Sequence, residues 1–396
     1  MTDLTPQQKL DLITKDLQEV MSRNIVEDIV MNEQRPLKIY WGTAITGKPH
    51  AAYFVPMIKL AQFLRADCAV TILLADIHGT MDADKTDKQF LEPRTEYYRF
   101  VITNMLKAIG VNLDKLRIVK GSTFQDTLPY YRDLMQIIGI TTQRNANKAG
   151  SDVVKQLEDA PMKGMVYPLM QALDEDHLDV DAQFGGVDQR KIFTYAAETL
   201  PKLGKRKRAH LMNPMVPGLT GGKMSSSEPE SKVDVLDAPE VVTKKIKKAV
   251  AEPKKVEGNG LLAFARYVLL PASELRLGEA RFVVERVREE KEPLVYSTME
   301  KMEEDYANDV LTPQLLKLAV TKALNELLGP IQMAYMQSPE EQEMTKKAYP
   351  ELGKEKPAKD KKKDKGGKKK GQGKEDEVKE EKAATNGVDV PIRAAE

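Results

Sequence analysis

The sequence predicts an α/β fold, in which a doubly wound parallel sheet is followed by an α-helical domain and a disordered lysine-rich tail. First, short apolar segments alternate with segments of helical periodicity between residues 31 and 235. Second, the run AVTILLAD (69–76) is apolar throughout and ends in Asp, as strands buried on both faces do. Third, the strand pattern fades beyond residue 235. In such a sheet, ligands bind beyond the carboxyl ends of the strands.

The N-terminal segment and the elements of the sheet domain follow in order. We expect residues 1–30 to form a helical segment, because the apolar residues Leu10, Ile13 and Leu17 recur close to the 3.6-residue period of an α-helix. The α/β domain is expected to span 31–235. Its strands are predicted at 37–44, 69–76, 116–119, 177–184 and 209–216, and its helices at about 50–65, 92–110, 124–138 and from 188 onward.

The C-terminal part is predicted to differ in kind. Residues 236–345 are expected to form a separate helical domain, in which Pro239 and Pro313 lie near helix starts. Residues 351–396 are rich in Lys, Glu and Gly and hold almost no large apolar side chains. Such a composition cannot bury a core, so we expect this tail to be disordered.

Composition excludes several classes of protein. The chain has 396 residues, of which 41% are hydrophobic and one is a cysteine, Cys68. A single cysteine excludes an internal disulfide and a multi-cysteine zinc site. No apolar run approaches the ~18 residues that a membrane span needs, and the polar, acidic start predicts neither a secretory signal nor a transit peptide. We expect a cytoplasmic protein that does not enter membranes.

The formal net charge of +1 hides an uneven distribution of charge. Acidic residues gather at 172–181, and basic residues gather at 202–210, 244–248 and 354–374. Clustered Lys and Arg attract nucleic acid by neutralising its phosphates. An ordinary solvated surface is the alternative interpretation of each basic cluster.

The stretch YWGTAITGKPHAAY (40–53) nearly matches a P-loop. Gly42, Gly47 and Lys48 fit the G-x-x-x-x-G-K pattern, but Pro49 stands where Ser or Thr is required. Proline offers neither a hydroxyl group nor an N–H, whereas it fits the first turn of a helix. The stretch therefore predicts a strand, a turn and a helix start that carries His50 and favours phosphate. A purely structural histidine is the alternative.

A second stretch, LTGGKMSSS (219–227), contains serine hydroxyl groups, which the first stretch lacks. A glycine turn precedes one lysine, Lys223, and three hydroxyl groups, on Ser225, Ser226 and Ser227. These groups predict a mobile loop that grasps phosphate. Such a loop alone would not indicate a phosphate site. Its combination with GKPHAAY on an α/β sheet makes the prediction of a phosphate site specific.

The two stretches together resemble the signatures of class I aminoacyl-tRNA synthetases. HAAY (50–53) is similar to their HIGH motif and KMSSS (223–227) to their KMSKS motif, with departures at Ala52, Tyr53 and Ser226. The resemblance implies a Rossmann-like catalytic domain that uses ATP with Mg²⁺ as a substrate, with no permanently bound cofactor and no metal site. The implied ATP-binding or catalytic residues are Gly42, Thr43, His50, Tyr53, Asp188, Lys223, Met224, Ser225, Ser226 and Ser227.

A set of polar residues indicates the amino acid. Tyr167, Gln171 and Asp174 recur at i, i+4 and i+7, which places them on one face of a helix. Tyr40 and Asp174 can hydrogen-bond a phenol hydroxyl, while Tyr167, Gln171 and Gln189 can hold an ammonium group. An ordinary polar helix face is the alternative interpretation.

With YPLMQALD, QFGGVDQRKIF and HLMNPMVPGLTGGKMSSS, the chain resembles the eukaryotic and archaeal tyrosyl-tRNA synthetases over most of 35–345. Its layout is similar to the shorter cytoplasmic form of fungi. The resemblance implies that tyrosine is activated with ATP and transferred to tRNA(Tyr). It also implies that Tyr40 and Asp174 bind the substrate hydroxyl, that Asp188 lies near the ribose and that His78 lies beside the pocket. A tryptophanyl-tRNA synthetase and a non-catalytic RNA-binding relative are the alternatives.

The same resemblance assigns partners. The helical domain at 236–345 is expected to read the anticodon, and a homodimer is expected through an insertion at about 112–160. The expected partners are therefore tRNA(Tyr), L-tyrosine, ATP and a second copy of the chain. The basic segment 244–248 is similar to one that relatives use in tRNA binding and nuclear import, which adds the nucleus to the expected locations. Its lysines are Lys244, Lys245, Lys247 and Lys248.

Overall fold

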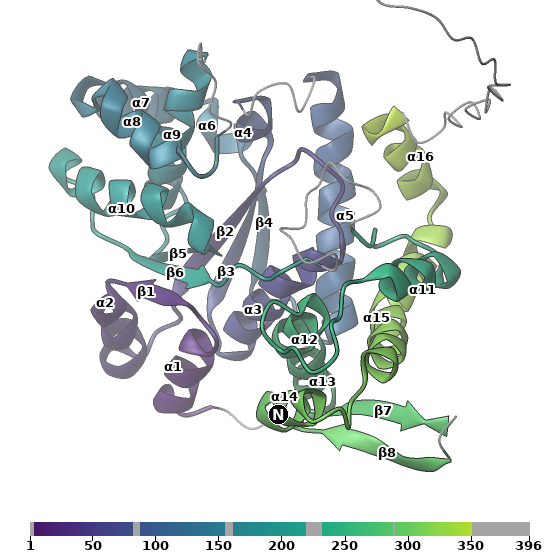
Figure 1. The fold of residues 1–396 in the computed structure, drawn as a ribbon. Helices are drawn as coiled ribbons and strands as arrows, with labels where there is room; N and C mark the ends of the chain where they lie inside the picture. The colour runs from purple at the N-terminus through teal and green to yellow at the C-terminus, as the bar shows by residue number, and fades with distance from the viewer. Residues whose placement is uncertain (1–3, 82–87, 155–160, 219–231, 288–289, 351–396) are drawn as a thin grey trace, which may run out of the picture. The chain divides into compact units, whose positions relative to one another are not determined.

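The computed structural model describes residues 4–81, 88–154, 161–218, 232–287 and 290–350 (Figure 1). Its main sheet has six strands in the order β1-β6-β5-β2-β3-β4. The strands are β1 (Glu19–Met21), β2 (Lys38–Ala44), β3 (Ala69–Ala75), β4 (Leu116–Lys120), β5 (Ala182–Gly186) and β6 (Ala209–Asn213). Strands β2 to β6 pair in parallel, and β1 joins the β6 edge antiparallel. The predicted doubly wound sheet is thus confirmed, with one antiparallel edge strand added.

The strand order reverses between β2 and β5. Strands β3 and β4 lie on one side of β2, and β5 and β6 lie on the other. The chain therefore leaves the carboxyl ends of β2 and β5 in opposite directions, which opens a crevice at this switch point. The register places Tyr40 of β2 between Thr71 of β3 and Gln183 of β5.

Both faces of the sheet are covered, as alternation along β2 shows. Ile39 and Trp41 belong to the large core that includes α3 (Phe54–Arg65) and α5 (Leu91–Ile109), whereas Tyr40 points to the opposite face. A second core joins the helices between β4 and β6. These helices are α7 (Leu128–Ile140), α8 (Gln143–Gly150), α9 (Met162–His177) and α10 (Arg190–Thr199), and the short α4 (Asp76–Met81) and α6 (Ser122–Gln125) follow β3 and β4.

The N-terminal segment corrects one prediction. Residues 1–30 do not form one helix, because α1 (Pro6–Thr14) ends well before β1, and α2 (Arg23–Glu27) continues into a π-helical turn, Asp28–Glu33. Asp16 and Ser22 take positive φ angles, at which a right-handed helix cannot continue. The buried face of α1, Leu10 and Ile13, was predicted correctly.

The segment after residue 235 is mainly helical, and Pro239 and Pro313 lie at the helix starts as predicted. Its helices are α11 (Pro239–Lys248), α12 (Gly260–Phe264), α13 (Leu270–Leu277), α14 (Met299–Ala307), α15 (Pro313–Met336) and α16 (Pro339–Ala348). The sequence missed the antiparallel hairpin of β7 (Phe282–Arg286) and β8 (Lys291–Tyr296). Buried Phe282 and Val284 alternate there with more exposed residues, but the alternation covers too few residues to indicate a strand from the sequence.

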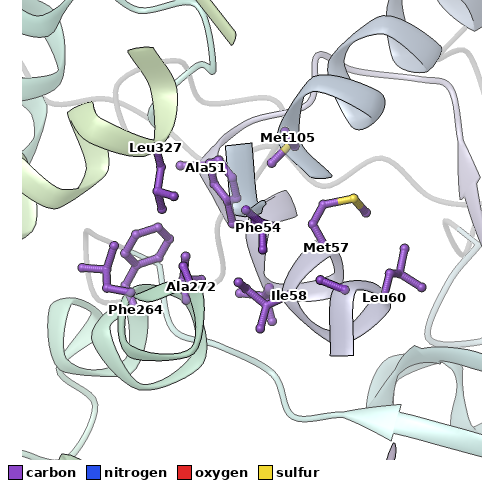
Figure 2. Close-up of a cluster of buried hydrophobic side chains, with 14 of the residues drawn as sticks. Ala51, Phe54, Met57, Ile58, Leu60, Met105, Phe264, Ala272 and Leu327 are labelled. Carbon is purple, nitrogen blue, oxygen red and sulfur yellow. The ribbon is translucent and has the colours of Figure 1, made fainter. Parts of the chain in front are cut away.

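The helical segment packs on α3 through a continuous apolar core. Figure 2 shows Phe264, Ala272 and Leu327 beside Phe54 and Ile58 of α3. A boundary near residue 236 remains a prediction, and the predicted disordered tail, 351–396, lies outside the described residues. None of the described helices combines the length and the apolar composition that a bilayer crossing requires.

Candidate active site

A cavity of about 360 Å³ lies at the switch point, between the carboxyl halves of β2 and β5 and helix α9. Its volume falls in the range of small-molecule sites. Because α9 is a helix, the spacing of Tyr167, Gln171 and Asp174 brings all three to the cavity, as predicted. The predicted site residues that line it are Tyr40, Gly42, Thr43, Tyr53, Tyr167, Gln171, Asp174, Asp188 and Gln189.

The closed end of the cavity is formed by two buried side chains, Tyr40 and Asp174. The Tyr40 hydroxyl donates to the carbonyl oxygen of Gln171 at 3.2 Å. Oδ1 of Asp174 accepts from Gln125 Nε2 at 2.8 Å and from the Tyr130 hydroxyl at 2.9 Å. Oδ2 of Asp174 is buried and has no hydrogen-bond partner among the described residues. This end therefore offers one acceptor and one hydroxyl group to a ligand.

Electrostatics at the closed end favour neutral groups. Burial raises the pKa of Asp174 to about 7, although the hydrogen bonds from Gln125 and Tyr130 act in the opposite direction. Burial also raises the pKa of Tyr40 well above its usual value. His78 on α4 lies with Nε2 4.0 Å from Oδ2 of Asp174, and burial lowers its pKa to about 4. At neutral pH His78 is therefore an uncharged wall of the cavity, in the position that the sequence predicted.

The opposite end of the cavity carries amide and carboxylate groups. Gln171 Nε2 donates to Gln189 Oε1 at 3.2 Å, and Gln189 Nε2 donates to Asp188 Oδ2 at 3.4 Å. Gly185 leaves room for this arrangement, because a Cβ there would lie 3.0 Å from Cγ of Gln189. The same holds for Gly186, where a Cβ would lie 2.3 Å from Oδ1 of Asp188. Acceptor oxygens at this end suit a ligand ammonium group.

His50 lies next to the cavity, in extended backbone before the 3-10 turn Ala51–Tyr53 that leads into α3. Pro49 therefore precedes the helix and does not occupy its first turn, which corrects the prediction. The His50 ring meets the Tyr53 ring edge-on at 5.6 Å. Burial, followed by the charge of Lys232, lowers the pKa of His50 to about 4. His50 is thus a neutral hydrogen-bonding group at neutral pH.

The loop before His50 is held from three directions. The Tyr98 hydroxyl, on α5, donates to the carbonyl oxygen of Gly47, and Arg94 Nη1 donates to that of Thr46 at 2.7 Å. From the end of the last described segment, the Tyr349 hydroxyl also donates to Gly47 O, at 3.2 Å. Directly after His50, Ala51 N donates to Val233 O at 2.8 Å. The loop is therefore fixed independently of any ligand.

Five predicted residues cannot be placed. Lys223, Met224, Ser225, Ser226 and Ser227 lie outside the described residues. The chain that follows them runs beside the site, since Asp234 forms an antiparallel bridge with His50.

The basic clusters have different surroundings. On α11, Lys244, Lys247 and Lys248 are exposed, whereas Lys245 pairs with Asp237 at 2.6 Å. The cluster at 202–210 is not an open basic surface, because it pairs with the acidic segment 172–181. Its ion pairs are Lys205–Asp176 at 2.6 Å, Arg206–Asp181 at 2.9 Å and Arg208–Asp176 at 2.8 Å.

Helix α7 presents an apolar face to solvent. It lies within the range 112–160, for which an insertion was predicted; β4, at the start of that range, is a strand of the main sheet. The exposed apolar side chains of α7 are Leu128, Tyr131, Met135, Ile138 and Ile140. Contiguous exposed apolar side chains of this kind mark interaction surfaces.

Comparisons with known proteins show which family the chain is similar to. The family model described as tRNA synthetases class I (W and Y) matches residues 31–329. The chain is 49% identical over 348 residues to a cytoplasmic tyrosine–tRNA ligase of Saccharomyces cerevisiae, covering 87% of this chain and 88% of that protein. It is 51% identical over 353 residues to the Xenopus tropicalis ligase of the same name, covering 89% of this chain but only 65% of the relative.

A solved structure is similar as well. The tyrosyl-tRNA synthetase of Archaeoglobus fulgidus, crystallised with L-tyrosine, matches with a TM-score of 0.76 and 34% sequence identity. That match covers 83% of this chain and 99% of the archaeal one.

Proposed function

Because the chain belongs to the class I tRNA synthetases for tryptophan and tyrosine, we propose that it is a tyrosine–tRNA ligase. It activates L-tyrosine with ATP to give tyrosyl-adenylate and pyrophosphate, and then transfers the tyrosyl group to the 3′ end of tRNA(Tyr). The observation that carries the proposal is Oδ2 of Asp174, which has no hydrogen-bond partner among the described residues and is buried beside Tyr40 at the closed end of the cavity.

The closed end suits a phenol. A phenol hydroxyl can donate its proton to Oδ2 of Asp174. The Tyr40 hydroxyl, which donates to Gln171 O when the cavity is empty, can turn its one proton to the phenol oxygen instead. A phenylalanine ring would leave the carboxylate unpaired, and a buried unpaired polar group costs about 1–3 kcal/mol, more if it is charged. Selectivity for tyrosine therefore follows from hydrogen bonding and needs no editing step.

The other end of the same cavity suits the amino group. Oxygens of Tyr167, Gln171 and Gln189 can accept from an α-ammonium, and Asp188 lies next to Gln189 where an adenosine ribose would follow. The substrate then spans the cavity from phenol to ammonium, with its carboxylate toward Gly42, Thr43 and the nucleotide.

Adenylate formation needs positioning and charge stabilisation. The tyrosine carboxylate is already a nucleophile at neutral pH, so its attack on the α-phosphate of Mg-ATP requires no general base. The fixed loop at 46–50 holds the phosphates, and neutral His50 donates a hydrogen bond to them. Lys223 and the hydroxyl groups of Ser225, Ser226 and Ser227 supply the remaining contacts.

The partners follow from surfaces outside the cavity. The exposed lysines of α11 suit the phosphates of tRNA(Tyr), and the segment 236–345 reads the anticodon. The apolar face of α7 suits a second copy of the chain, giving a homodimer that a mass measurement in solution tests. The proposed location is the cytoplasm, with nuclear import through 244–248.

Amino-acid-dependent exchange between ATP and pyrophosphate tests the proposal. With all twenty amino acids supplied in turn, tyrosine alone is expected to support rapid exchange, and tRNA(Tyr) is then expected to accept the label. Exchange that depends on tryptophan would identify the sibling enzyme. A complete lack of exchange would identify a non-catalytic relative.

A further inference from the structure

We propose that Tyr130 and Gln125 are positioning residues, which hold the Asp174 carboxylate so that its Oδ2 faces the substrate hydroxyl. The inference rests on the proposed function and deepens it, because it assigns part of the tyrosine selectivity to side chains behind the cavity. Neither residue lines the cavity, and neither belongs to a recognised sequence motif.

The side-chain hydrogen bonds that Asp174 accepts from Gln125 and Tyr130 both end on the same carboxylate oxygen, Oδ1. Gln125 Nε2 and the Tyr130 hydroxyl both donate to Oδ1, at 2.8 and 2.9 Å. An ionised carboxylate accepts through both oxygens, so two donors on Oδ1 fix its rotation and leave Oδ2 for a ligand. Without them the carboxylate could turn and offer either oxygen at a range of angles.

The amide of Gln125 packs against Gly121. Gln125 ends α6, and its Oε1 lies so close to Gly121 that a Cβ at residue 121 would come within 2.7 Å. The glycine therefore leaves room for the amide at this point. Because Asp174 accepts hydrogen bonds when ionised, the amide nitrogen must face the carboxylate, and the amide oxygen must face Gly121.

Tyr130 adds sensitivity to the charge of Asp174. Its hydroxyl lies within hydrogen-bond distance of both Asp174 Oδ1, at 2.9 Å, and Met170 O, at 3.0 Å. It has one proton, which the carboxylate attracts more strongly when it is ionised. The Tyr130 hydroxyl therefore favours the ionised form, and removing it favours the protonated form.

The other groups that face Asp174 come from several elements. Neutral His78 on α4 approaches Oδ2 at 4.0 Å, and Tyr40 of β2 shares the closed end of the cavity. Glu175, the next residue of α9, raises the pKa of Asp174 and is itself paired with His210 at 2.7 Å. In the part of the chain that the structure describes, none of these groups donates to either oxygen of Asp174 in place of Gln125 or Tyr130.

The substitution Tyr130→Phe removes only the donor. The Tyr130 ring packs against His177 at 4.7 Å and Phe124 at 5.8 Å, and a phenylalanine ring keeps both contacts. Tyr195→Phe is the matched control, because Tyr195 belongs to the same hydrophobic core and its hydroxyl meets Thr141 at 2.6 Å, away from Asp174. Gln125→Met is an independent second variant, which keeps the length of the side chain and removes the amide donor.

The test compares tyrosine-dependent and phenylalanine-dependent pyrophosphate exchange in the full-length protein across neutral pH. For Tyr130→Phe and Gln125→Met, we expect the KM for tyrosine to rise about tenfold with kcat retained, while the KM for phenylalanine stays unchanged. The acidic limb of the pH profile of the tyrosine KM is expected to move to higher pH. Tyr195→Phe is expected to behave like the wild type.

Two results separate the inference from its premise. If the wild type exchanges with tyrosine but both variants keep its selectivity and pH profile, or Tyr195→Phe changes them equally, the positioning role is wrong. If the wild type shows no tyrosine-dependent exchange, the proposed function is wrong and the inference falls with it. If Tyr130→Phe does not fold, as thermal unfolding would reveal, Gln125→Met decides by the same criteria.

Discussion

The hydroxyl of Tyr349 lies 3.2 Å from the carbonyl oxygen of Gly47, and this contact joins residues 302 positions apart in the chain. The Tyr349 ring also lies over Lys48 and Arg94, which belong to the same loop and to the helix that holds it. Tyr349, the residue directly after α16, is thereby in contact with the loop that we propose to bind ATP. The last described helix and the nucleotide loop are thus one structural unit.

Tyr349→Phe is expected to loosen this loop. The variant keeps the ring and loses one hydrogen bond, so we expect the KM for ATP to rise about three- to tenfold while the KM for tyrosine stays the same. The ATP dependence of pyrophosphate exchange measures the effect. Tyr335→Phe is the control, because its ring meets Phe100 on α5 and not the loop. An unchanged KM for ATP in Tyr349→Phe would contradict the role of this hydrogen bond.

Asp174 is expected to destabilise the free protein at neutral and higher pH. Its pKa is about 7 when folded and near 4 when unfolded, so the folded state binds more protons between these values. The stability therefore falls as pH rises from about 4 to about 7, by up to about 4 kcal/mol. Asp174→Asn is expected to be more stable than the wild type above pH 7 and equal to it below pH 4. Urea unfolding at the two extremes measures the difference, and a pH-independent difference would refute the burial effect.

His50 is expected to act on the chemical step. We expect His50→Ala to lower the rate of adenylate formation about a hundredfold, while tyrosine affinity barely changes, because His50 belongs to the loop that we propose to hold the phosphates and does not line the cavity. Single-turnover kinetics separates the two quantities. Since its pKa is about 4, no loss of rate from protonation of His50 is expected between pH 6 and 8. Lys223→Ala is predicted to show the same split, and unchanged rates in both variants would exclude the assignment.

The lysines of α11 are expected to contribute to tRNA binding. The single substitutions Lys244→Ala and Lys247→Ala should each weaken tRNA binding. Each should also lower the slope of the logarithm of the binding constant against the logarithm of the salt concentration, by about one for each phosphate that is no longer neutralised. Binding titrations at several salt concentrations measure the slope. Pyrophosphate exchange should not change. Lys245→Ala, whose ammonium already pairs with Asp237, should have the smaller effect. An equal effect of all three substitutions would contradict a specific surface.

The sequence predicted the elements that short apolar runs or helical spacing indicate by themselves. Alternation of apolar strands and helices predicted the parallel strands, and the spacing of Tyr167, Gln171 and Asp174 placed them on one face of α9. The hairpin β7–β8 and the edge strand β1 were missed. Their sequences, FVVER, KEPLVY and EVM, mix charged with apolar residues and lack the continuous apolar run that marked a parallel strand such as β3.

Contacts between distant segments could not be predicted. Nothing near Gln125 or Tyr130 in the sequence indicates that they hold Asp174, and nothing near Tyr349 indicates that it reaches Gly47. The sequence left the role of the basic segment at 202–210 open for the same reason, since its acidic partners at 172–181 are brought near by the parallel pairing of β5 and β6.

The most direct measurement is the ratio of kcat/KM for tyrosine to that for phenylalanine in pyrophosphate exchange, in the wild type and in Asp174→Ala. If Oδ2 of Asp174 recognises the substrate hydroxyl, the wild type strongly prefers tyrosine and the variant loses at least about tenfold of that ratio, which corresponds to about 1.4 kcal/mol. A folded Asp174→Ala protein with the selectivity of the wild type would show that the hydroxyl is recognised elsewhere.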